Sequence, residues 1–342
     1  NYITVYILGG KMAEFRYNPL LDDWTIVNGD RQHRPDMPKD YCAFCPGSNQ
    51  IKDTYTVLKY DNDWPSMMPN PPQPDDIDTE LFKTAPSYGK AEVILYSPKH
   101  DASLWELSID HLTKLVNLWK ERFIEIKKDE NIKYIMPFEN RGKEVGTTQP
   151  HPHGQIYGYG FMPLRLKLEL ENSKKFYDKN NKSLILSIRD EELKVDKRVV
   201  FQNDSFVVFL PFYTDFPYGV YIVPLKDDIH TFEDFDEKTS EDFADILKKT
   251  QGMFDKLYNK VFPYMMCIYQ TPVNSELENE SKSYYNFHVK FYPPLRGENS
   301  IKWYASSETG AWAKTNPRRV EETVFELKDA YKEFMEDKEV IW

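Results

Sequence analysis

Apolar residues recur at helical spacing in three stretches of the chain, where they lie three or four positions apart. The stretches are residues 108–127, 239–261 and 317–336. Thr239 and Asp242 precede the apolar positions of the second stretch and are predicted to form a capping box. Asn316 and Pro317 are predicted to begin the third helix, as its N-cap and its first helical residue.

Short runs rich in β-branched and aromatic residues lie between these helices and predict strands. The runs are residues 92–97, 133–138, 153–161, 205–211, 219–224, 264–270 and 285–292. The segment Pro65–Asp76 is instead rich in proline. Proline donates no backbone hydrogen bond, so this segment is predicted to be an extended loop.

The same order of elements occurs twice along the chain. A strand that ends near Pro98 is followed by a helix, a strand, a loop and a strand at His151, and the same series leads from Pro224 to His288. The two spans are 53 and 64 residues, and the polar loop at 271–284 can absorb the difference because loops tolerate insertions. The pattern predicts an α+β fold made of a duplicated unit on a mainly antiparallel sheet.

The charge and cysteine content exclude several classes of protein. Lys and Arg number 44 against 55 Asp and Glu, and the net charge of −11 argues against coating nucleic acid or an anionic membrane. No apolar run approaches the roughly 20 residues that span a bilayer. Three cysteines are too few for a disulfide scaffold, and they suit a reducing, cytoplasmic compartment. A small anionic ligand is not excluded, since it needs only a local basic site.

Two of the seven histidines lie in the sequence His-Pro-His-Gly-Gln at positions 151–155. On a strand, His151, His153 and Gln155 project from one face, about 7 Å apart. The two prolines around His151 and His153 favour an edge or a cleft over a central position. The motif therefore predicts a functional site, and a solvated polar edge is the alternative.

Cys42 and Cys45 have the two-residue gap of a zinc knuckle. A redox pair or two unrelated small residues are the alternatives for this fragment alone. A complete site needs two more ligands, for which His100 and one histidine of the pair are candidates. A site of Cys42, Cys45, His100 and His151 would be closed and structural, and it would leave His153 outside.

A histidine outside the metal site can act as a nucleophile, because imidazole is largely neutral at pH 7. Attack of His153 on phosphorus gives a phosphoramidate that a second reactant can displace, if donors surround the phosphoryl oxygens. Candidate donors are Gln155, the guanidinium groups of Arg31 and Arg34, and the hydroxyl and backbone N–H groups of the loop 146–148. For the two arginines, ordinary surface charge is the alternative.

Short motifs follow one another from about Phe15 to Glu333, nearly the whole chain. They are Arg16-Tyr-Asn-Pro-Leu20, Arg31-Gln-His-Arg34-Pro, Cys42-Ala-Phe-Cys45-Pro-Gly, Asn62-Asp63, Ser97-Pro-Lys-His100, Phe138-Glu-Asn140-Arg-Gly, His151-Pro-His153-Gly-Gln155 and His288-Val-Lys-Phe-Tyr-Pro-Pro294. Each motif alone is weak. In this order the set resembles the galactose-1-phosphate uridylyltransferase family of the histidine-triad superfamily.

The resemblance implies two histidine-triad-like units that form a half-barrel flanked by helices. Residues 12–195 would hold the zinc site and the nucleophile, and residues 196–342 would form a second, non-nucleophilic unit. Independently of the resemblance, Met12 is a candidate start with residues 1–11 as an extension before it, and an ordinary first strand is the alternative. The implied reaction is a ping-pong transfer. His153 takes UMP from UDP-glucose, releases glucose 1-phosphate and passes the UMP to galactose 1-phosphate. The family is usually a homodimer in which the partner completes each site.

The resemblance also assigns roles to single residues. Cys42, Cys45, His100 and His151 correspond to the ligands of one structural zinc ion, and Gln155 to the glutamine that steadies the transferred phosphoryl group. The nucleotide, phosphate and hexose contacts would come from Arg31, Arg34, Asn62, Asp63, Asn140, Gly146, Thr147, Thr148, Lys302 and Glu308.

Two departures from the family pattern affect these expectations. Some members hold a second metal on a glutamate and three histidines, which correspond here to Glu169, Tyr269, His288 and Lys290. A protonated lysine cannot ligate and tyrosine is a poor substitute, so this second site is predicted to be absent. In addition, Ser307 and Lys314 replace tyrosine and glutamine near Glu308, which leaves the exact sugar open.

Two other functions remain as alternatives. A nucleoside-diphosphate-sugar or dinucleoside-polyphosphate phosphorylase would use the same His153 with phosphate as the acceptor, although Glu308 favours a hexose. A non-catalytic nucleotide-binding zinc protein would not need both His153 and Gln155. In each case the partners are small molecules rather than nucleic acid or membrane.

Overall fold

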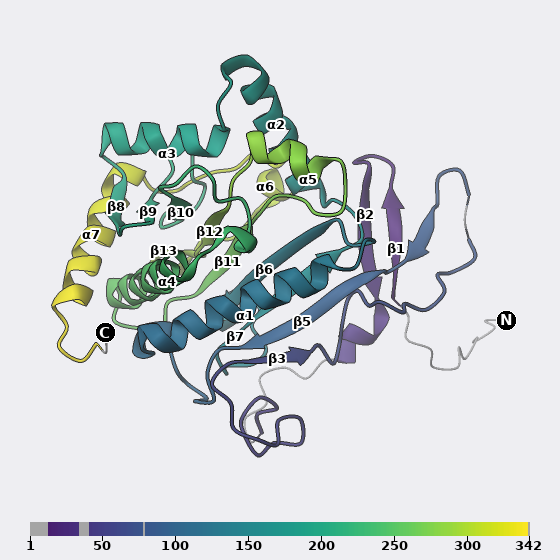
Figure 1. The fold of residues 1–342 in the computed structure, drawn as a ribbon, viewed down its shortest axis with the longest axis horizontal. Helices are drawn as coiled ribbons and strands as arrows, with labels where there is room; N and C mark the ends of the chain where they lie inside the picture. Colours follow the sequence, from purple (N-terminus) through teal and green to yellow (C-terminus); the bar gives the residue numbers. More distant parts are fainter. Residues whose placement is uncertain (1–12, 34–40, 78, 341–342) are drawn as a thin grey trace.

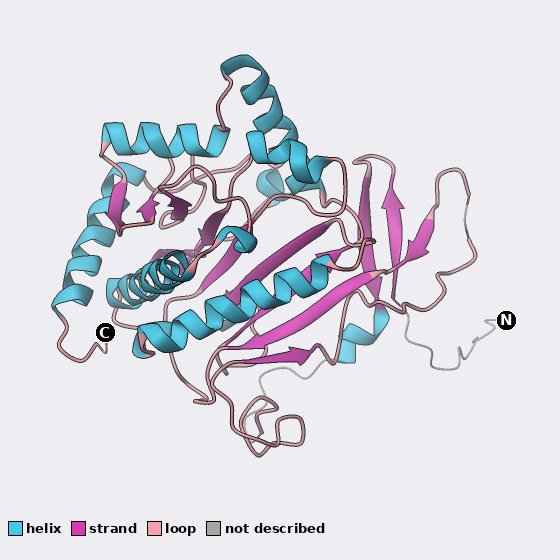
Figure 2. Cartoon of the chain, in the orientation of Figure 1, coloured by secondary structure: helices cyan, strands magenta, loops and turns pink. Residues whose placement is uncertain are grey.

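The computed structural model describes residues 13–33, 41–77 and 79–340, and its centre is a nine-stranded sheet (Figures 1 and 2). In spatial order the strands are β3 (Leu58–Asp61), β5 (Gly89–Leu95), β7 (His153–Tyr159), β6 (Tyr134–Arg141), β11 (Tyr264–Tyr269), β12 (His288–Tyr292), β10 (Tyr221–Pro224), β9 (Phe206–Phe209) and β8 (Val199–Gln202). Every neighbouring pair of these strands is antiparallel. The α+β class with a mainly antiparallel sheet is therefore confirmed.

The order of the strands makes the duplication visible. The series β5-β7-β6 of the first repeat is mirrored by β10-β12-β11 of the second, and the two repeats join where β6 pairs with β11. In each repeat one long helix connects the first of these strands to the last: α1 (Ile109–Lys127) leads to β6, and α4 (Glu237–Leu257) leads to β11. The predicted duplicated unit is confirmed.

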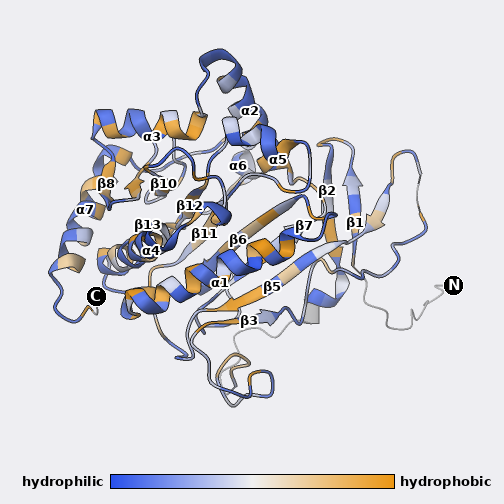
Figure 3. Ribbon diagram, viewed as in Figure 1, coloured by the Kyte–Doolittle hydropathy of each residue, from blue (hydrophilic) through white to orange (hydrophobic). Residues whose placement is uncertain are grey.

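Helices α1 and α4 cover one face of the sheet, and α7 (Val320–Glu336) packs against α4. One continuous core lies beneath them, with Trp119 and Phe123 of α1 and Phe243 and Phe254 of α4 almost fully buried. Figure 3 shows this pattern as hydrophobic residues along β5 and β6 and an alternation of hydrophobic and hydrophilic residues along α1. Burial of each such aromatic side chain contributes about 2 kcal/mol.

The opposite face of the sheet is covered differently in the two repeats. Over the second repeat lie α2 (Leu164–Asn180), whose Leu166 packs against Tyr134 and Tyr269, and α3 (Leu184–Val195). Over the first repeat lies a small sheet of β2 (Asp23–Asn28), β1 (Ala13–Asn18) and β4 (Thr84–Pro86), whose Phe15 packs against Tyr157. His153, Gln155 and Tyr157 alternate along β7, so the side chains of the predicted site lie on this face.

Several short elements complete the described part of the chain. They are η1 (Gly29–His33), η2 (Leu104–Glu106), η3 (Lys143–Val145), η4 (Phe232–Asp234), α5 (Leu277–Glu280), η5 (Ser281–Ser283), β13 (Leu295–Gly297), β14 (Ser300–Ile301) and α6 (Ser306–Gly310). None of the helices in this part is long and apolar enough to cross a lipid bilayer. The segment Pro65–Asp76 is irregular apart from a single bridge at Met68, as its prolines predict.

All seven predicted strands and all three predicted helices are present within a few residues of their expected ends. The predicted capping box at Thr239 and Asp242 is wrong. Helix α4 begins earlier, because the carboxylate of Asp236 accepts the backbone N–H of Thr239 at 2.7 Å and so caps the helix.

The predicted start of α7 is also wrong. Asn316 accepts the N–H of Arg318 at 3.0 Å and donates to the Thr214 carbonyl at 2.9 Å, so it stabilises a turn that precedes the helix. The helix itself begins at Val320. The proposed extension at residues 1–11 and Met12 lie outside the described residues, and the boundary between the two units after Val195 stays a prediction.

Helices α2 and α3 were not predicted from the sequence. At the start of α2, leucine occupies every second position from Leu164 to Leu170, a pattern typical of a strand. In the fold only Leu166 and Leu170 of these are buried, while Leu168 stays exposed. The buried pair has helical spacing, but the exposed leucines conceal it in the sequence.

Candidate active site and metal centre

Four side chains from distant parts of the chain converge at one point. They are Cys42, Cys45, His100 and His151, and their ligand atoms lie within 4.8 Å of one another. The Nδ1 atom of His151 is 3.6 Å from each sulfur, and the Nδ1 atom of His100 is 3.4 Å from the sulfur of Cys45. A tetrahedral zinc ion with bonds of about 2.0–2.3 Å would separate its ligands by roughly 3.3–3.8 Å. The donor set and its spacing therefore fit such an ion.

Hydrogen bonds hold His151 in the orientation that a metal ligand needs. Its Nε2–H donates to the carbonyl oxygen of Ser97 at 2.8 Å, with the hydroxyl of Tyr55 also 2.8 Å away. The carbonyl can only accept, so the neutral ring has its lone pair on Nδ1, which faces the two sulfurs. Burial lowers the pKa of His151 to about 4, and the ring is neutral at pH 7.

His153 begins β7, two residues after the ligand His151. Its Nδ1 lies 2.7 Å from the backbone oxygen of His151 and donates a hydrogen bond to it. A carbonyl oxygen accepts only, so the lone pair of the neutral ring is on Nε2. The ring of Phe44, between the two cysteines, lies 5.3 Å from the ring of His153. Phe44 thus packs beside the predicted nucleophile and belongs to the segment that carries the two cysteines.

Gln155 lies on the same face of β7, and its amide is oriented by a neighbour. The side-chain N–H of Asn62 donates to the amide oxygen of Gln155 at 3.2 Å, while the amide oxygen of Asn62 accepts the N–H of Trp64 at 2.9 Å. This chain of hydrogen bonds turns the oxygen of Gln155 toward Asn62. The NH₂ group of Gln155 is then the donor that remains for a bound group.

Two adjoining cavities open at His153, Gln155 and Thr148, which line both of them. Cavity A, of about 360 Å³, is further lined by Arg31, Ser66, Asn140, Gly146 and Thr147. Cavity B, of about 400 Å³, is further lined by Tyr41, Phe44, Tyr60, Asn62, Asp63 and Trp64. Cavity A is mainly polar, whereas cavity B is mainly apolar and includes four aromatic side chains, so the pair suits a ligand with a phosphate part and a planar ring.

Hydrogen bonds orient polar side chains in both cavities. Arg31 donates from Nη1 to the carbonyl of Trp64 at 3.2 Å and to the hydroxyl of Ser66 at 2.5 Å. In cavity B, Asp63 accepts the hydroxyl of Tyr60 at 2.8 Å. Arg34 lies outside the described residues, so its predicted role stays untested.

The loop before β7 differs from the expected anion nest. The backbone N–H of Gly146 donates to Lys143 at 3.1 Å and that of Thr147 to Gly142 at 3.4 Å, so these two amides are used within the loop. The hydroxyl of Thr147 likewise donates to the Asn140 carbonyl at 2.7 Å. The loop lines cavity A as predicted, but these bonds serve to fix its shape.

Lys302 and Glu308 do not line the cavities that contain His153. They form a buried ion pair with a distance of 2.7 Å between Nζ and Oε1, in the segment around α6. Glu308 also accepts the backbone N–H of Thr315 at 3.3 Å. Within the described chain, these two predicted substrate contacts are therefore separate from the predicted nucleophile.

The second repeat has a lysine at the position of His153. His153 pairs with Leu95, three residues before Pro98, and Lys290 pairs with Tyr221, three residues before Pro224. His153 and Lys290 therefore occupy equivalent positions in the two repeats. Lys290 places its Nζ 2.7 Å from both carboxylate oxygens of Glu169. This ion pair occupies two of the four positions considered for a second metal, and the absence of that metal stays a prediction.

Several residues that shape the site were not predicted from the sequence. Phe44, Tyr60 and Trp64 line cavity B, and Tyr55 contacts the metal ligand His151. All four are aromatic and lie near the cysteines or the Asn-Asp pair. That clustering is a signal, but an aromatic residue in a sequence is more often part of a core.

Gly154 separates His153 from Gln155, and a β-carbon added to it would clash with the hydroxyl of Tyr96 and lie 2.9 Å from the carbonyl oxygen of Phe138. We expect Gly154→Ala to lower the free energy of unfolding by about 2 kcal/mol or more, because the new methyl group overpacks this contact. Urea denaturation measures the change. Gly297→Ala is a matched control in a strand, where the nearest atom to the new carbon is 3.9 Å away. Equal stability losses in both variants would contradict the expectation.

Comparison with known proteins identifies the family of the chain. Residues 11–163 match the family model of the galactose-1-phosphate uridyl transferase N-terminal domain, and residues 169–305 match that of the C-terminal domain. The galactose-1-phosphate uridylyltransferase of Thermotoga maritima is 37% identical over 319 residues, which cover 93% of this chain and 98% of the relative. That of Schizosaccharomyces pombe is 30% identical, with 84% of this chain and 86% of the relative covered.

Solved structures support the same assignment. A uridylyltransferase structure superposes with a TM-score of 0.83 at 30% identity, and the match covers 94% of this chain and 99% of the other. An ADP-glucose phosphorylase from Arabidopsis thaliana has the same fold, with a TM-score of 0.70 at 21% identity over 93% of this chain and 99% of the other. The family models together span most of the chain, and the chain belongs to the galactose-1-phosphate uridylyltransferase family of transferases.

Proposed function

We propose that the protein transfers UMP from UDP-glucose to galactose 1-phosphate by a ping-pong mechanism through a uridylyl-histidine intermediate. The observation that supports this most directly is the hydrogen bond that orients the ring of His153. Its Nδ1–H is held by the His151 carbonyl at 2.7 Å, which leaves the lone pair on Nε2 beside two cavities. The relatives named galactose-1-phosphate uridylyltransferase support the choice of substrates.

In the first step, Nε2 of His153 attacks the α-phosphorus of UDP-glucose. A P–N bond forms, the bond from that phosphorus to the bridging oxygen breaks, and glucose 1-phosphate leaves with the electron pair. In the second step, a phosphate oxygen of galactose 1-phosphate attacks the same phosphorus and the P–N bond breaks. The His151 carbonyl stabilises the positive ring of the intermediate, because it accepts the Nδ1–H.

The two cavities would divide the substrate between them. The aromatic walls of cavity B suit the uracil ring, and the polar walls of cavity A suit the phosphates and the sugar. The NH₂ group of Gln155, oriented by Asn62, would donate to a phosphoryl oxygen, and Arg31 would supply positive charge. These contacts are worth most in the transition state, where charge is spread over the equatorial oxygens.

We also propose that the metal held by Cys42, Cys45, His100 and His151 is a structural zinc ion. When bound, it would supply a cross-link between the segment around the two cysteines and the start of β7. Phe44, which lies between those cysteines and forms part of the wall of cavity B, would be fixed by the same cross-link.

The resemblance to the family further suggests a cytoplasmic homodimer. In a single chain the pair Lys302 and Glu308 lies away from His153, although the family pattern gives both residues substrate contacts. We propose that the segment around α6 of a second copy, which contains Lys302 and Glu308, lies at the cavities of the first. Cross-linking or sedimentation that finds only monomers at assay concentration would contradict this arrangement.

The test of the reaction is to trap the intermediate. The protein is incubated with UDP-glucose labelled at the α-phosphorus, and the acid-labile label is mapped by peptide analysis. We expect label on His153, and a chase with galactose 1-phosphate should convert it to UDP-galactose. A chase that succeeds only with inorganic phosphate would favour the phosphorylase, and no adduct at all would overturn both.

A further inference from the structure

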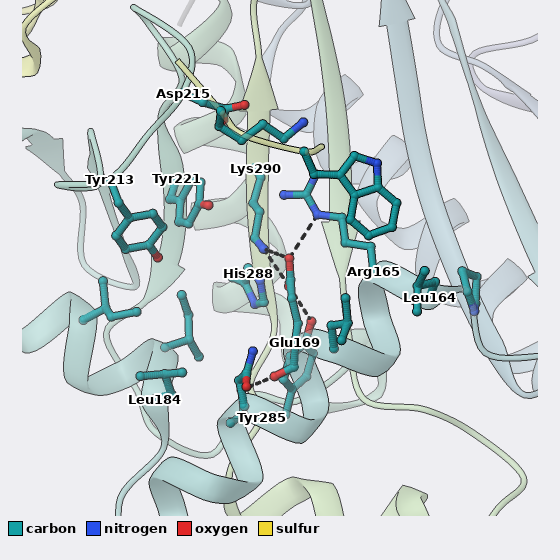
Figure 4. A pocket seen from close by; sticks show the side chains of 18 of the residues that line it. Leu164, Arg165, Glu169, Leu184, Tyr213, Asp215, Tyr221, Tyr285, His288 and Lys290 are labelled. Carbon is teal, nitrogen blue, oxygen red and sulfur yellow. Dashed lines mark hydrogen bonds and ion pairs between the residues drawn. The ribbon is translucent and has the colours of Figure 1, made fainter. Parts of the chain in front are cut away.

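A third cavity lies on the same face of the sheet, in the second repeat. Cavity C, of about 730 Å³, lies between α2, α3, β10 and β12 and shares no lining residue with cavities A and B (Figure 4). Its floor is formed by Arg165, Glu169, His288 and Lys290. The volume is within the range of pockets that bind small molecules.

The floor holds more positive than negative charge. Lys290 contacts both carboxylate oxygens of Glu169 at 2.7 Å, and the Nε of Arg165 contacts one of them at 3.2 Å. Burial alone would raise the pKa of Glu169, but the positive charges around it, that of Lys290 first, lower it to about 2. Burial lowers the pKa of His288 to about 3, so this ring is neutral. Burial also lowers the pKa of Lys290, but its contacts with both oxygens of Glu169 hold the two in an ion pair. Lys290 and Arg165 therefore share one carboxylate.

The carboxylate is already saturated by its neighbours, whereas the guanidinium is not. Glu169 also lies 3.4 Å from the hydroxyl of Tyr285, which donates to it. Arg165 uses only its Nε in hydrogen bonds within residues 13–33, 41–77 and 79–340, and its side chain is 59% exposed. Its two terminal nitrogens, Nη1 and Nη2, remain as a planar pair of donors at the cavity, the geometry that binds two oxygens of one anion.

The rest of the cavity is suited to an apolar or aromatic body. Figure 4 shows Tyr213, Tyr221 and Leu184 on the side of the pocket opposite Arg165. Leu168 and Ile185 add apolar surface to the lining. The cavity thus has a cationic end and an apolar end.

The rim of the cavity carries charges of both signs, Asp23, Asp215 and Lys314. Asp215 accepts the hydroxyl of Tyr304 at 3.1 Å, and Lys314 lies over the ring of Tyr304 at 4.4 Å from its centre. Asp23 and Asp215 are the carboxylates of the lining besides Glu169, and Lys314 is its cation besides Arg165 and Lys290. The excess of positive charge is therefore confined to the floor, where Arg165 and Lys290 lie.

We propose that cavity C is a second binding site, which takes a small organic oxyanion with an apolar or aromatic body, such as a phosphate monoester or a carboxylate. The oxyanion would accept from Nη1 and Nη2 of Arg165, and the body would lie against Tyr213, Tyr221 and Leu184. This site does not depend on His153 or on the proposed transfer reaction.

Phenyl phosphate and benzoate are the probes, and they distinguish a phosphate from a carboxylate. Each is titrated by calorimetry at low salt into the wild-type protein, Arg165→Gln and Arg31→Gln. Arg165→Gln removes the charge at an exposed position, so the variant should fold. We expect it to weaken binding about tenfold or more, while Arg31→Gln, which alters cavity A, leaves this site unchanged. Inorganic phosphate should bind more weakly than phenyl phosphate, because it lacks the body.

A second measurement needs no variant. Phenylglyoxal modifies accessible arginines, and peptide mass spectrometry reports each position separately. The probe that binds should slow modification of Arg165, including in a His153→Gly protein. The proposal is overturned if neither probe binds below about 1 mM (roughly the affinity worth 4 kcal/mol), if Arg165→Gln binds within twofold of wild type, or if Arg165 is not protected.

Discussion

His153→Gly should form no uridylyl adduct and should lose at least about four orders of magnitude in the rate of transfer. The reason is chemical, because glycine offers no lone pair with which to attack phosphorus. The cavities should persist, since His153 starts a strand that is paired on both sides by β5 and β6. Trapping of labelled UDP-glucose and steady-state kinetics measure the loss, and thermal melting reports on the fold.

Two matched variants separate nucleophilicity from packing. His153→Asn keeps a polar side chain against Phe44 but cannot form the adduct, so it should be as inactive as the glycine variant. Gln155→Ala keeps the nucleophile and loses one phosphoryl donor, which should cost roughly 10²–10³-fold in rate. An adduct that still forms on His153→Gly protein would show that another residue is the nucleophile.

Cys42→Ser should lose the bound metal and lower the melting temperature by roughly 20–40 °C. Four ligands from three segments meet at this centre, so its metal ties residues 42–45 to His100 and to the start of β7. The free energy of zinc binding in small domains is about 10 kcal/mol, and each kcal/mol is worth roughly 2–4 °C in a protein of this size class. Metal analysis and melting curves measure the two effects, and the loss of stability should exceed the loss of chemistry.

Cys267→Ser is the matched control for the metal centre. Cys267 lies in β11, outside the cluster of metal ligands, and serine has nearly the same size. This variant should retain one zinc ion per chain and most of its stability. A chelator should destabilise the wild-type protein and leave the melting curve of Cys42→Ser unchanged. A normal melting curve for metal-free Cys42→Ser would remove the structural role of the ion.

Local patterns in the sequence predicted most of the fold. The apolar stripe of α1 and the β-branched runs of the central strands are determined by residues near one another, so they can be recognised in the sequence alone. The pairing of β6 with β11 depends on residues more than 120 positions apart. Only the repeated order of elements indicated that the strands of the two units would belong to one sheet.

The candidate site was predictable to a similar extent. The two-residue gap of the cysteines and the alternation of His151, His153 and Gln155 place chemical groups at distances set by the backbone, which the sequence reveals. The position of Lys302 and Glu308 is determined by how a distant segment packs, and this leaves no short-range pattern. Cavity C was hidden for the same reason, since it forms between helices that the sequence did not indicate.

The pairing of β6 with β11 has a consequence for how the protein unfolds. Residues 138–141 pair with residues 264–267 across it, and a single hydrophobic core runs from Ile94 in the first repeat to Val324 in α7. Separation of the repeats would break this ladder and expose the shared core to water. The two copies should therefore melt together in one cooperative transition, and neither should persist as an independent folding unit.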